Sequence, residues 1–99
     1  MKIPKAFRVG KKKYDVMRRR TILTPVSNGR IFFDTGVILL ATHSGYTNKP
    51  ISQQEKDTAF WHETVHAILR DMKSPKNNDE VFVEGIARRL AQVVDTAEF

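Results

Sequence analysis

The residue pattern changes at Pro50, and this change constrains the fold more than any other feature of the 99-residue chain. Before Pro50, short apolar or alternating runs are separated by turn residues, a pattern typical of β-strands. After Pro50, no glycine or proline interrupts residues 52–73, and a second helical pattern covers residues 79–97. The sequence therefore predicts an α+β domain in which a small antiparallel sheet precedes two helices.

The length predicts one domain, because a chain of 99 residues is too short for two, so residues 1–99 form a single unit. In the strand half, Asn28-Gly29 predicts a hairpin turn because both residue types tolerate positive φ angles. The run Val37–Thr42 predicts a strand beside the first helix, with a free edge on which an extended peptide can pair. Ser52 is expected to cap that helix, with Glu55 as its capping-box partner.

The positive charge is concentrated at the N-terminal end. The chain carries 17 Lys and Arg residues against 11 Asp and Glu residues, a formal net charge of +6. Residues 1–20 have a net charge of +8, and the remaining residues have a net charge of −2. Within this basic segment, Ala6–Val9 and Tyr14–Arg18 predict a hairpin around a loop of about four residues, Gly10–Lys13.

Two basic clusters in this segment suggest a binding function. Two runs flank the predicted hairpin, Lys11–Lys13 and Arg18–Arg20, with Phe7 and Tyr14 interleaved among the basic residues of the segment. This pattern is typical of a module that docks on DNA, RNA or an acidic partner such as a regulatory protein. A solvated basic edge that prevents strand aggregation explains the same charges. The binding module is therefore an alternative to an enzymatic function.

The composition excludes several classes of site and of protein. The chain contains no cysteine, which excludes disulfides, cysteine zinc ribbons, iron–sulfur clusters and thiol nucleophiles. The longest apolar run, Val37–Ala41, is too short for a transmembrane helix or a secretory signal. We therefore expect a soluble cytoplasmic protein without a membrane partner.

The first predicted helix contains an H-E-x-x-H motif, His62-Glu63-Thr64-Val65-His66. Histidines at positions i and i+4 lie on one helix face and can occupy two corners of a tetrahedral zinc site. Glu63 lies further round the same face, where it can act as the general base toward a water activated by zinc. The neighbouring residues are mostly apolar, and ionisable groups on a largely buried helix favour a metal site over a solvated surface.

The third zinc ligand is expected to be a carboxylate. Leu69 and Met72 stand where a metzincin has its glycine and its third histidine, so the metzincin arrangement is excluded. The other histidine, His43, ends a strand, where a solvated role is more common than metal ligation. A His₂Glu site, as in thermolysin-like enzymes, is the remaining arrangement.

Two glutamates of the second helix compete for this position. Glu80 and Glu84 are one turn apart at the margin of the apolar face of that helix. Glu80 can instead form a capping box with Asn77. If the two helices are antiparallel, Glu84 is expected to lie level with His66, which favours Glu84. A pair of acids one turn apart also suits one metal ligand and one carboxylate that orients a ligand histidine.

The two helices resemble those of the small gluzincin-type zinc metallopeptidases of phages and other mobile elements, which are related to the ImmA/IrrE-like group. In gluzincins the ligand glutamate is followed four residues later by an acidic or amide residue, and Glu80 and Glu84 match this spacing. Val83-Glu84 stand where the ImmA/IrrE pattern has Ala-Asn. The resemblance implies a minimal zincin-like domain in which His62, His66 and Glu80 bind zinc, with Glu84 orienting a histidine or replacing Glu80 as the ligand.

The expected function is hydrolysis of peptide bonds in a peptide or protein substrate, such as a regulatory protein. Zinc would polarise the scissile carbonyl and lower the pKa of water to about 7, while Glu63 takes the proton and delivers it to the leaving amine. Tyr46, in the loop before the first helix, is a candidate donor to the oxyanion. A zinc-binding protein without catalytic activity is a further alternative.

Overall fold

The computed structural model of the protein describes residues 1–99 and contains a sheet followed by two helices, which confirms the predicted α+β class. The predicted helical segments agree with the observed helices to within two residues at each end. In chain order the elements are β1 (Ala6–Val9), β2 (Lys12–Arg19), β3 (Ile22–Leu23), β4 (Val26–Ser27), β5 (Gly29–Phe32), β6 (Val37–Ala41), α1 (Gln53–Asp71), the 3₁₀ helix η1 (Pro75–Asn78) and α2 (Glu80–Thr96).

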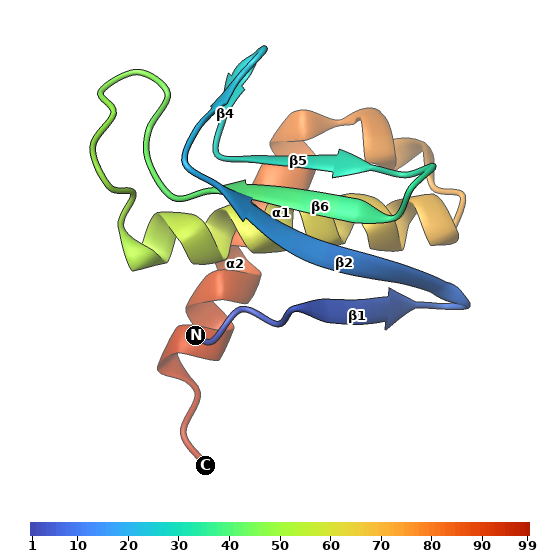
Figure 1. Cartoon of the computed structure of the whole chain (residues 1–99). Helices are drawn as coiled ribbons and strands as arrows, with labels where there is room; N and C mark the ends of the chain where they lie inside the picture. The colour runs from blue at the N-terminus through green and yellow to red at the C-terminus, as the bar shows by residue number, and fades with distance from the viewer.

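The main sheet has the strand order β1-β2-β6-β5, with β3 and β4 forming a separate two-stranded ribbon (Figure 1). The pairs β1–β2 and β5–β6 are antiparallel, whereas β2 and β6 are parallel. The prediction of an antiparallel sheet was therefore incomplete at its centre. Parallel strands need a crossover connection between them. Here the chain leaves β2, forms the β3–β4 ribbon and β5, and returns as β6 in the same direction as β2.

The edges of the sheet differ from the prediction in a way that matters for the site. The predicted strand at Val37–Thr42 corresponds to β6, which lies between β2 and β5 and has no free edge. The expectation that an extended peptide pairs with this strand is therefore wrong, because both of its edges are already hydrogen-bonded. The strands with open edges are β1 and β5.

The two predicted turns also differ from the observed ones. In the N-terminal hairpin, Val9 pairs with Lys12, so the turn is Gly10-Lys11 rather than a loop of about four residues. Gly10 has a positive φ of 58° there. Asn28-Gly29 does not form a hairpin turn, because Leu23 pairs with Val26 and the chain turns earlier. Gly29 instead begins β5.

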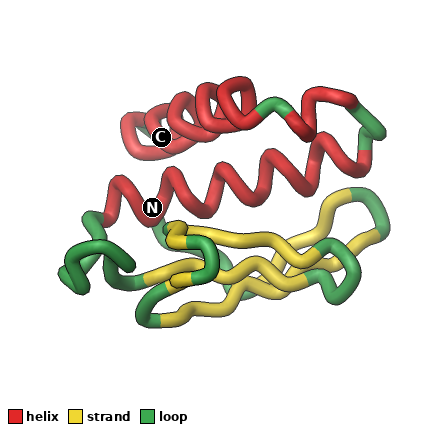
Figure 2. The backbone as a smooth tube through the Cα atoms, turned by 90° about the horizontal axis from the view of Figure 1, so that it is seen from above, coloured by secondary structure: helices red, strands yellow, loops and turns green.

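The elements are stacked in three layers, with α1 between the sheet and α2 (Figure 2). Toward the sheet, Phe60 and Ala67 of α1 join the main apolar core, which includes the fully buried Ile38 of β6. Toward α2, Val65 and Leu69 of α1 form a smaller cluster with Val83. The central helix is therefore buried on two sides, so polar groups on it lie close to low-dielectric surroundings.

The helix caps explain where the helices begin. Ser52 caps α1 as predicted, and its side chain accepts a hydrogen bond from the Glu55 amide at 3.2 Å, but the Glu55 side chain makes no return bond to Ser52. Asp79 caps α2, and its Oδ1 accepts from the Phe82 amide at 3.0 Å. The predicted capping role of Asn77 is therefore wrong, because the 3₁₀ helix places Asp79 at the cap position.

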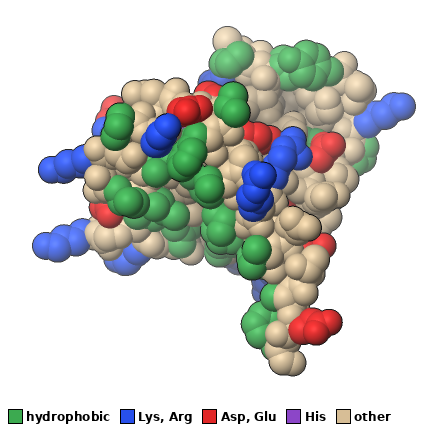
Figure 3. Space-filling view, turned by 180° about the vertical axis from the view of Figure 1, so that it is seen from behind, with side chains coloured by type: hydrophobic (Ala, Val, Ile, Leu, Met, Phe, Trp, Pro, Cys, Tyr) green, Lys and Arg blue, Asp and Glu red, His purple; other side chains and the backbone are tan.

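The outer face of the helical layer remains partly apolar. In the view from behind, hydrophobic side chains gather over this layer (Figure 3). On α2, Phe82 and Ile86 are each 37% exposed. Neither α1 nor α2 is long and apolar enough to cross a membrane.

Candidate metal centre

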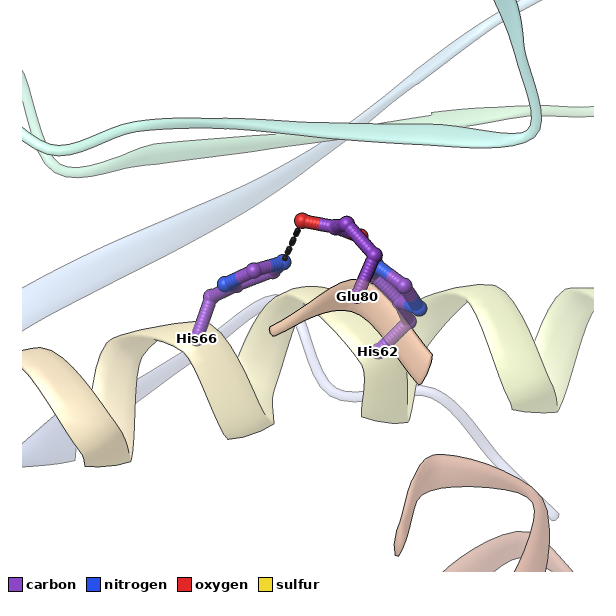
Figure 4. A group of neighbouring side chains, drawn as sticks. All are labelled: His62, His66 and Glu80. Carbon is purple, nitrogen blue, oxygen red and sulfur yellow. Dashed lines mark hydrogen bonds and ion pairs between the residues drawn. The ribbon is translucent and has the colours of Figure 1, made fainter. Parts of the chain in front are cut away.

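Three side chains from α1 and α2 converge in a group that can hold a metal ion. His62 and His66 project from successive turns of α1, and Glu80, the first residue of α2, lies over them (Figure 4). Glu80 Oε2 lies 2.9 Å from His62 Nε2, and Glu80 Oε1 lies 3.1 Å from His66 Nε2. One ligand atom from each residue lies within 4.8 Å of the others, so the three atoms can surround one ion.

Glu84 occupies a different position from the one expected. Its Oε1 accepts a hydrogen bond from His62 Nδ1 at 2.8 Å, and its Oε2 lies 2.9 Å from Arg88. The expectation that Glu84 lies level with His66 is therefore wrong. Because α2 begins near His66 and crosses α1 obliquely toward the start of that helix (Figure 1), one further turn brings Glu84 to His62, on the far side of its ring from Glu80.

The two histidines are oriented by their second ring nitrogens. His62 Nδ1 donates to Glu84, and His66 Nδ1 donates to Asn77 Oδ1 at 2.8 Å. With both Nδ1 atoms held in this way, both Nε2 atoms are directed toward Glu80 and can be metal ligands. Sequence reasoning missed Asn77, which it placed at the helix cap. The available signal for a residue that orients a ligand histidine was an amide side chain three residues before the ligand glutamate.

The charges around His62 act on its protonation. Burial lowers the pKa of His62, but the hydrogen bond to Glu84 and the charges of Glu63, Glu80 and Glu84 together raise this pKa above its ordinary value of 6.5. In the metal-free protein the ring thus lies between two carboxylates that favour its protonated form. A cation that replaces this proton would meet the same negative surroundings.

Glu63 is a buried carboxylate with an incomplete hydrogen-bond shell. Glu63 is only 6% exposed, and its Oε2 has no hydrogen-bond partner. Burial raises the pKa of Glu63 above 4.5, while the nearby His62 and His66 lower it less strongly. An unpartnered buried carboxylate oxygen beside two histidines fits a site that binds a further polar group.

Gly29 allows β5 to approach Glu63 closely. A Cβ atom at Gly29 would lie 3.2 Å from Glu63 Cγ and 3.5 Å from the Ala59 carbonyl oxygen. A side chain at this position would therefore press on the glutamate. Glycine suits this position because the sheet and the helix approach each other closely, and not because the chain turns here.

The metal group lies in an open cleft of about 850 Å³ between β5 and the two helices. Besides His62, Glu63, His66 and Glu80, this metal cleft is lined by β5 and by the charged residues Arg30, Glu55, Glu84 and Arg88. Tyr46 is 84% exposed on the loop between β6 and α1 and does not line the cleft. His43 also lies outside it, and its ring contacts Thr42.

The chain matches no protein-family model, no curated protein and no solved structure. The fold and the site define an α+β domain with a possible His-His-Glu metal centre in an open cleft.

Proposed function

We propose that the protein is a zinc-dependent metallopeptidase of the gluzincin type, similar to the ImmA/IrrE-like enzymes of phages and other mobile elements. One observation carries the proposal: the Nε2 atoms of His62 and His66 and the carboxylate of Glu80 converge beside the unpartnered buried oxygen of Glu63. A purely structural metal site needs the three ligands but has no use for this fourth group. The combination is that of a hydrolytic centre.

Zinc is the metal that this donor set favours. Two neutral imidazole nitrogens and one carboxylate oxygen are the ligands of His₂Glu catalytic zinc sites, which keep one position open. When bound, zinc supplies Lewis acidity, polarising a peptide carbonyl and lowering the pKa of water to about 7. His62, His66 and Glu80 would hold it, while Glu84 and Asn77 keep the two rings in the required orientation.

Glu63 is the general base in this proposal. Its unpartnered Oε2 accepts a proton from the attacking water and later delivers this proton to the leaving amine. Burial raises the pKa of Glu63, which brings the carboxyl closer to the pKa of an efficient base at neutral pH. The close packing against Gly29 restricts where the carboxylate can move.

The open edge of β5 is the binding surface for an extended peptide. The amide of Ala41 donates to Asn28 O at 2.9 Å, so Asn28 bonds to β6. In an antiparallel pair every second residue bonds to the partner strand, so the backbone N–H and C=O groups of Gly29 and Ile31 point away from β6, toward the cleft. The Gly29 amide is bonded to Ser27 Oγ, which leaves the N–H and C=O of Ile31 for the substrate. Strand addition here places a peptide bond above Glu63 and the metal ligands.

The proposal is tested by zinc content and by cleavage with two matched variants. The wild-type protein is expected to bind about one zinc per chain and to cleave unfolded casein or a quenched peptide library. Glu63→Gln should retain zinc and lose cleavage, whereas Glu55→Gln, which removes another carboxylate of the same cleft, should retain both.

Three results would contradict the proposal. Full cleavage by the Glu63→Gln variant would exclude Glu63 as the base. Stoichiometric zinc without cleavage by the wild-type protein would indicate the alternative, a zinc-binding protein without catalytic activity. Absence of zinc from the wild-type protein, or the same zinc content in the wild-type protein and a His62→Ala variant, would exclude the metal site itself.

A further inference from the structure

A second cleft, of about 780 Å³, shares no lining residue with the metal cleft. It lies between residues 1–6, the end of β2 and the first turn of α1. Four cationic side chains line it, Lys2, Lys5, Arg18 and Lys56, and no carboxylate does. We call these four residues the basic cleft.

Folding brings these charges together from distant parts of the chain. Tyr14 and Val16 of β2 are buried toward α1, and Arg18 continues the same alternating row at the end of the strand, where it reaches the cleft. Lys56 comes from α1. None of the four side chains lies within 4.0 Å of a carboxylate oxygen, so none of them forms an ion pair.

Unpaired charges of one sign in a concavity repel one another and attract a polyanion. We propose that the basic cleft is a docking site for the phosphodiester backbone of double-stranded DNA. This inference is independent of the metallopeptidase function, because the two clefts have no residue in common. A protein docked in this way would still present the metal cleft to a substrate.

The aromatic residues of the N-terminal hairpin favour a duplex over a single strand. Tyr14 is only 4% exposed and stacks on Phe7 with a centroid distance of 5.7 Å. Phe7 also packs edge-on against Phe60 of α1, so both hairpin rings belong to the core. Single-strand binding relies on exposed aromatic rings on which bases stack. Phosphate contacts without base stacking are typical of sequence-independent duplex binding.

A second basic group lies at the other end of the same hairpin. Lys11–Lys13 are exposed at the turn, whereas Lys5 pairs near Val16 and lies at the cleft end. The six residue-to-residue steps from Lys12 to Arg18 span about 20 Å at about 3.3 Å each. One DNA strand places about six phosphates along that length, and a duplex stays straight over it because its persistence length is about 150 base pairs.

Fluorescence anisotropy with a labelled 20-base-pair duplex tests the proposal. Four phosphate contacts by the basic cleft alone predict a slope of log affinity against log salt of about −3.6, so affinity falls about 150-fold between 50 and 200 mM salt. The double variant R18A/K56A is expected to reduce the slope to about −1.8 and this loss to about 12-fold. The control K76A/R89A removes two charges from outside the basic cleft and should leave the slope unchanged.

Further outcomes of these measurements support or overturn DNA docking at the basic cleft. Unchanged zinc content and an unchanged circular dichroism spectrum of R18A/K56A, together with the reduced slope, would support the basic cleft. No binding at 50 mM salt, equal weakening by K76A/R89A, or tighter binding to a single-stranded oligonucleotide of the same length would overturn the proposal. Binding to vesicles with anionic phosphatidylserine but not to the duplex would also overturn it.

Discussion

The orientation of His66 by Asn77 leads to a quantitative prediction about metal affinity. Asn77 Oδ1 accepts a hydrogen bond from His66 Nδ1 at 2.8 Å, and the His66 side chain is only 12% exposed. In an Asn77→Ala variant the buried N–H group has no partner, and an unsatisfied group of this kind costs about 1–3 kcal/mol. This cost corresponds to about 5- to 150-fold in the dissociation constant, in line with the roughly 10- to 100-fold effects of partners that orient ligand histidines.

The assay is competition for zinc between the protein and a chromophoric chelator at constant pH. We expect the dissociation constant of Asn77→Ala to rise about 10- to 100-fold. Asn78→Ala is the matched control, because Asn78 lies in the same 3₁₀ helix and lines the same cleft, but its side chain makes no hydrogen bond. Asn77→Asp should preserve zinc binding, since a carboxylate accepts the same hydrogen bond from His66.

Equal zinc affinity of Asn77→Ala and Asn78→Ala would refute this reasoning. A loss of affinity in Asn77→Asp as large as that in Asn77→Ala would refute it as well, because the acceptor would then be irrelevant. Thermal unfolding of each variant in the absence of zinc separates an effect on the metal from an effect on folding.

The pKa values of His62 and Glu63 are both raised in the folded metal-free protein, so the folded chain binds more protons than the unfolded chain. The free energy of unfolding should therefore fall as pH rises from about 4.5 through the raised pKa of His62. Zinc requires the deprotonated histidine, so the zinc-induced rise in Tm should be larger at pH 7.5 than at pH 5.5 in differential scanning fluorimetry, and an equal rise at both would contradict this. Gly29→Ala should destabilise the protein by about 1–3 kcal/mol and impair cleavage, because its Cβ would lie 3.2 Å from Glu63 Cγ. Gly85→Ala, in the interior of α2, should instead stabilise by about 0.5–1 kcal/mol, so urea unfolding curves should shift in opposite directions for the two glycines. Ile38→Ala should cost about 2–5 kcal/mol in the same assay, because Ile38 is 0% exposed in the main core, and a loss below 1 kcal/mol would show that the site collapses around the cavity.

Local physical chemistry made much of this protein predictable. The spacing of His62 and His66 places them on one face of any helix, and Ser52 caps α1 through a hydrogen bond to a residue three positions away. The switch from turn-separated strands to uninterrupted helix at Pro50 was sufficient for the α+β class. Each of these features depends on residues within about one helical turn or one strand of each other.

Tertiary packing decided which of these residues meet. The parallel pairing of β2 with β6 makes β5 the edge strand of the metal cleft, whereas the sequence pattern had predicted a free edge at Val37–Thr42. The depth at which α2 docks on α1 puts Glu80 between the two Nε2 atoms and Glu84 behind His62. Helix geometry within α1 accounts for the arrangement of the two histidines and the adjacent glutamate. Their partners come from residues far apart in the chain, and these residues meet only when the layers of the fold pack together.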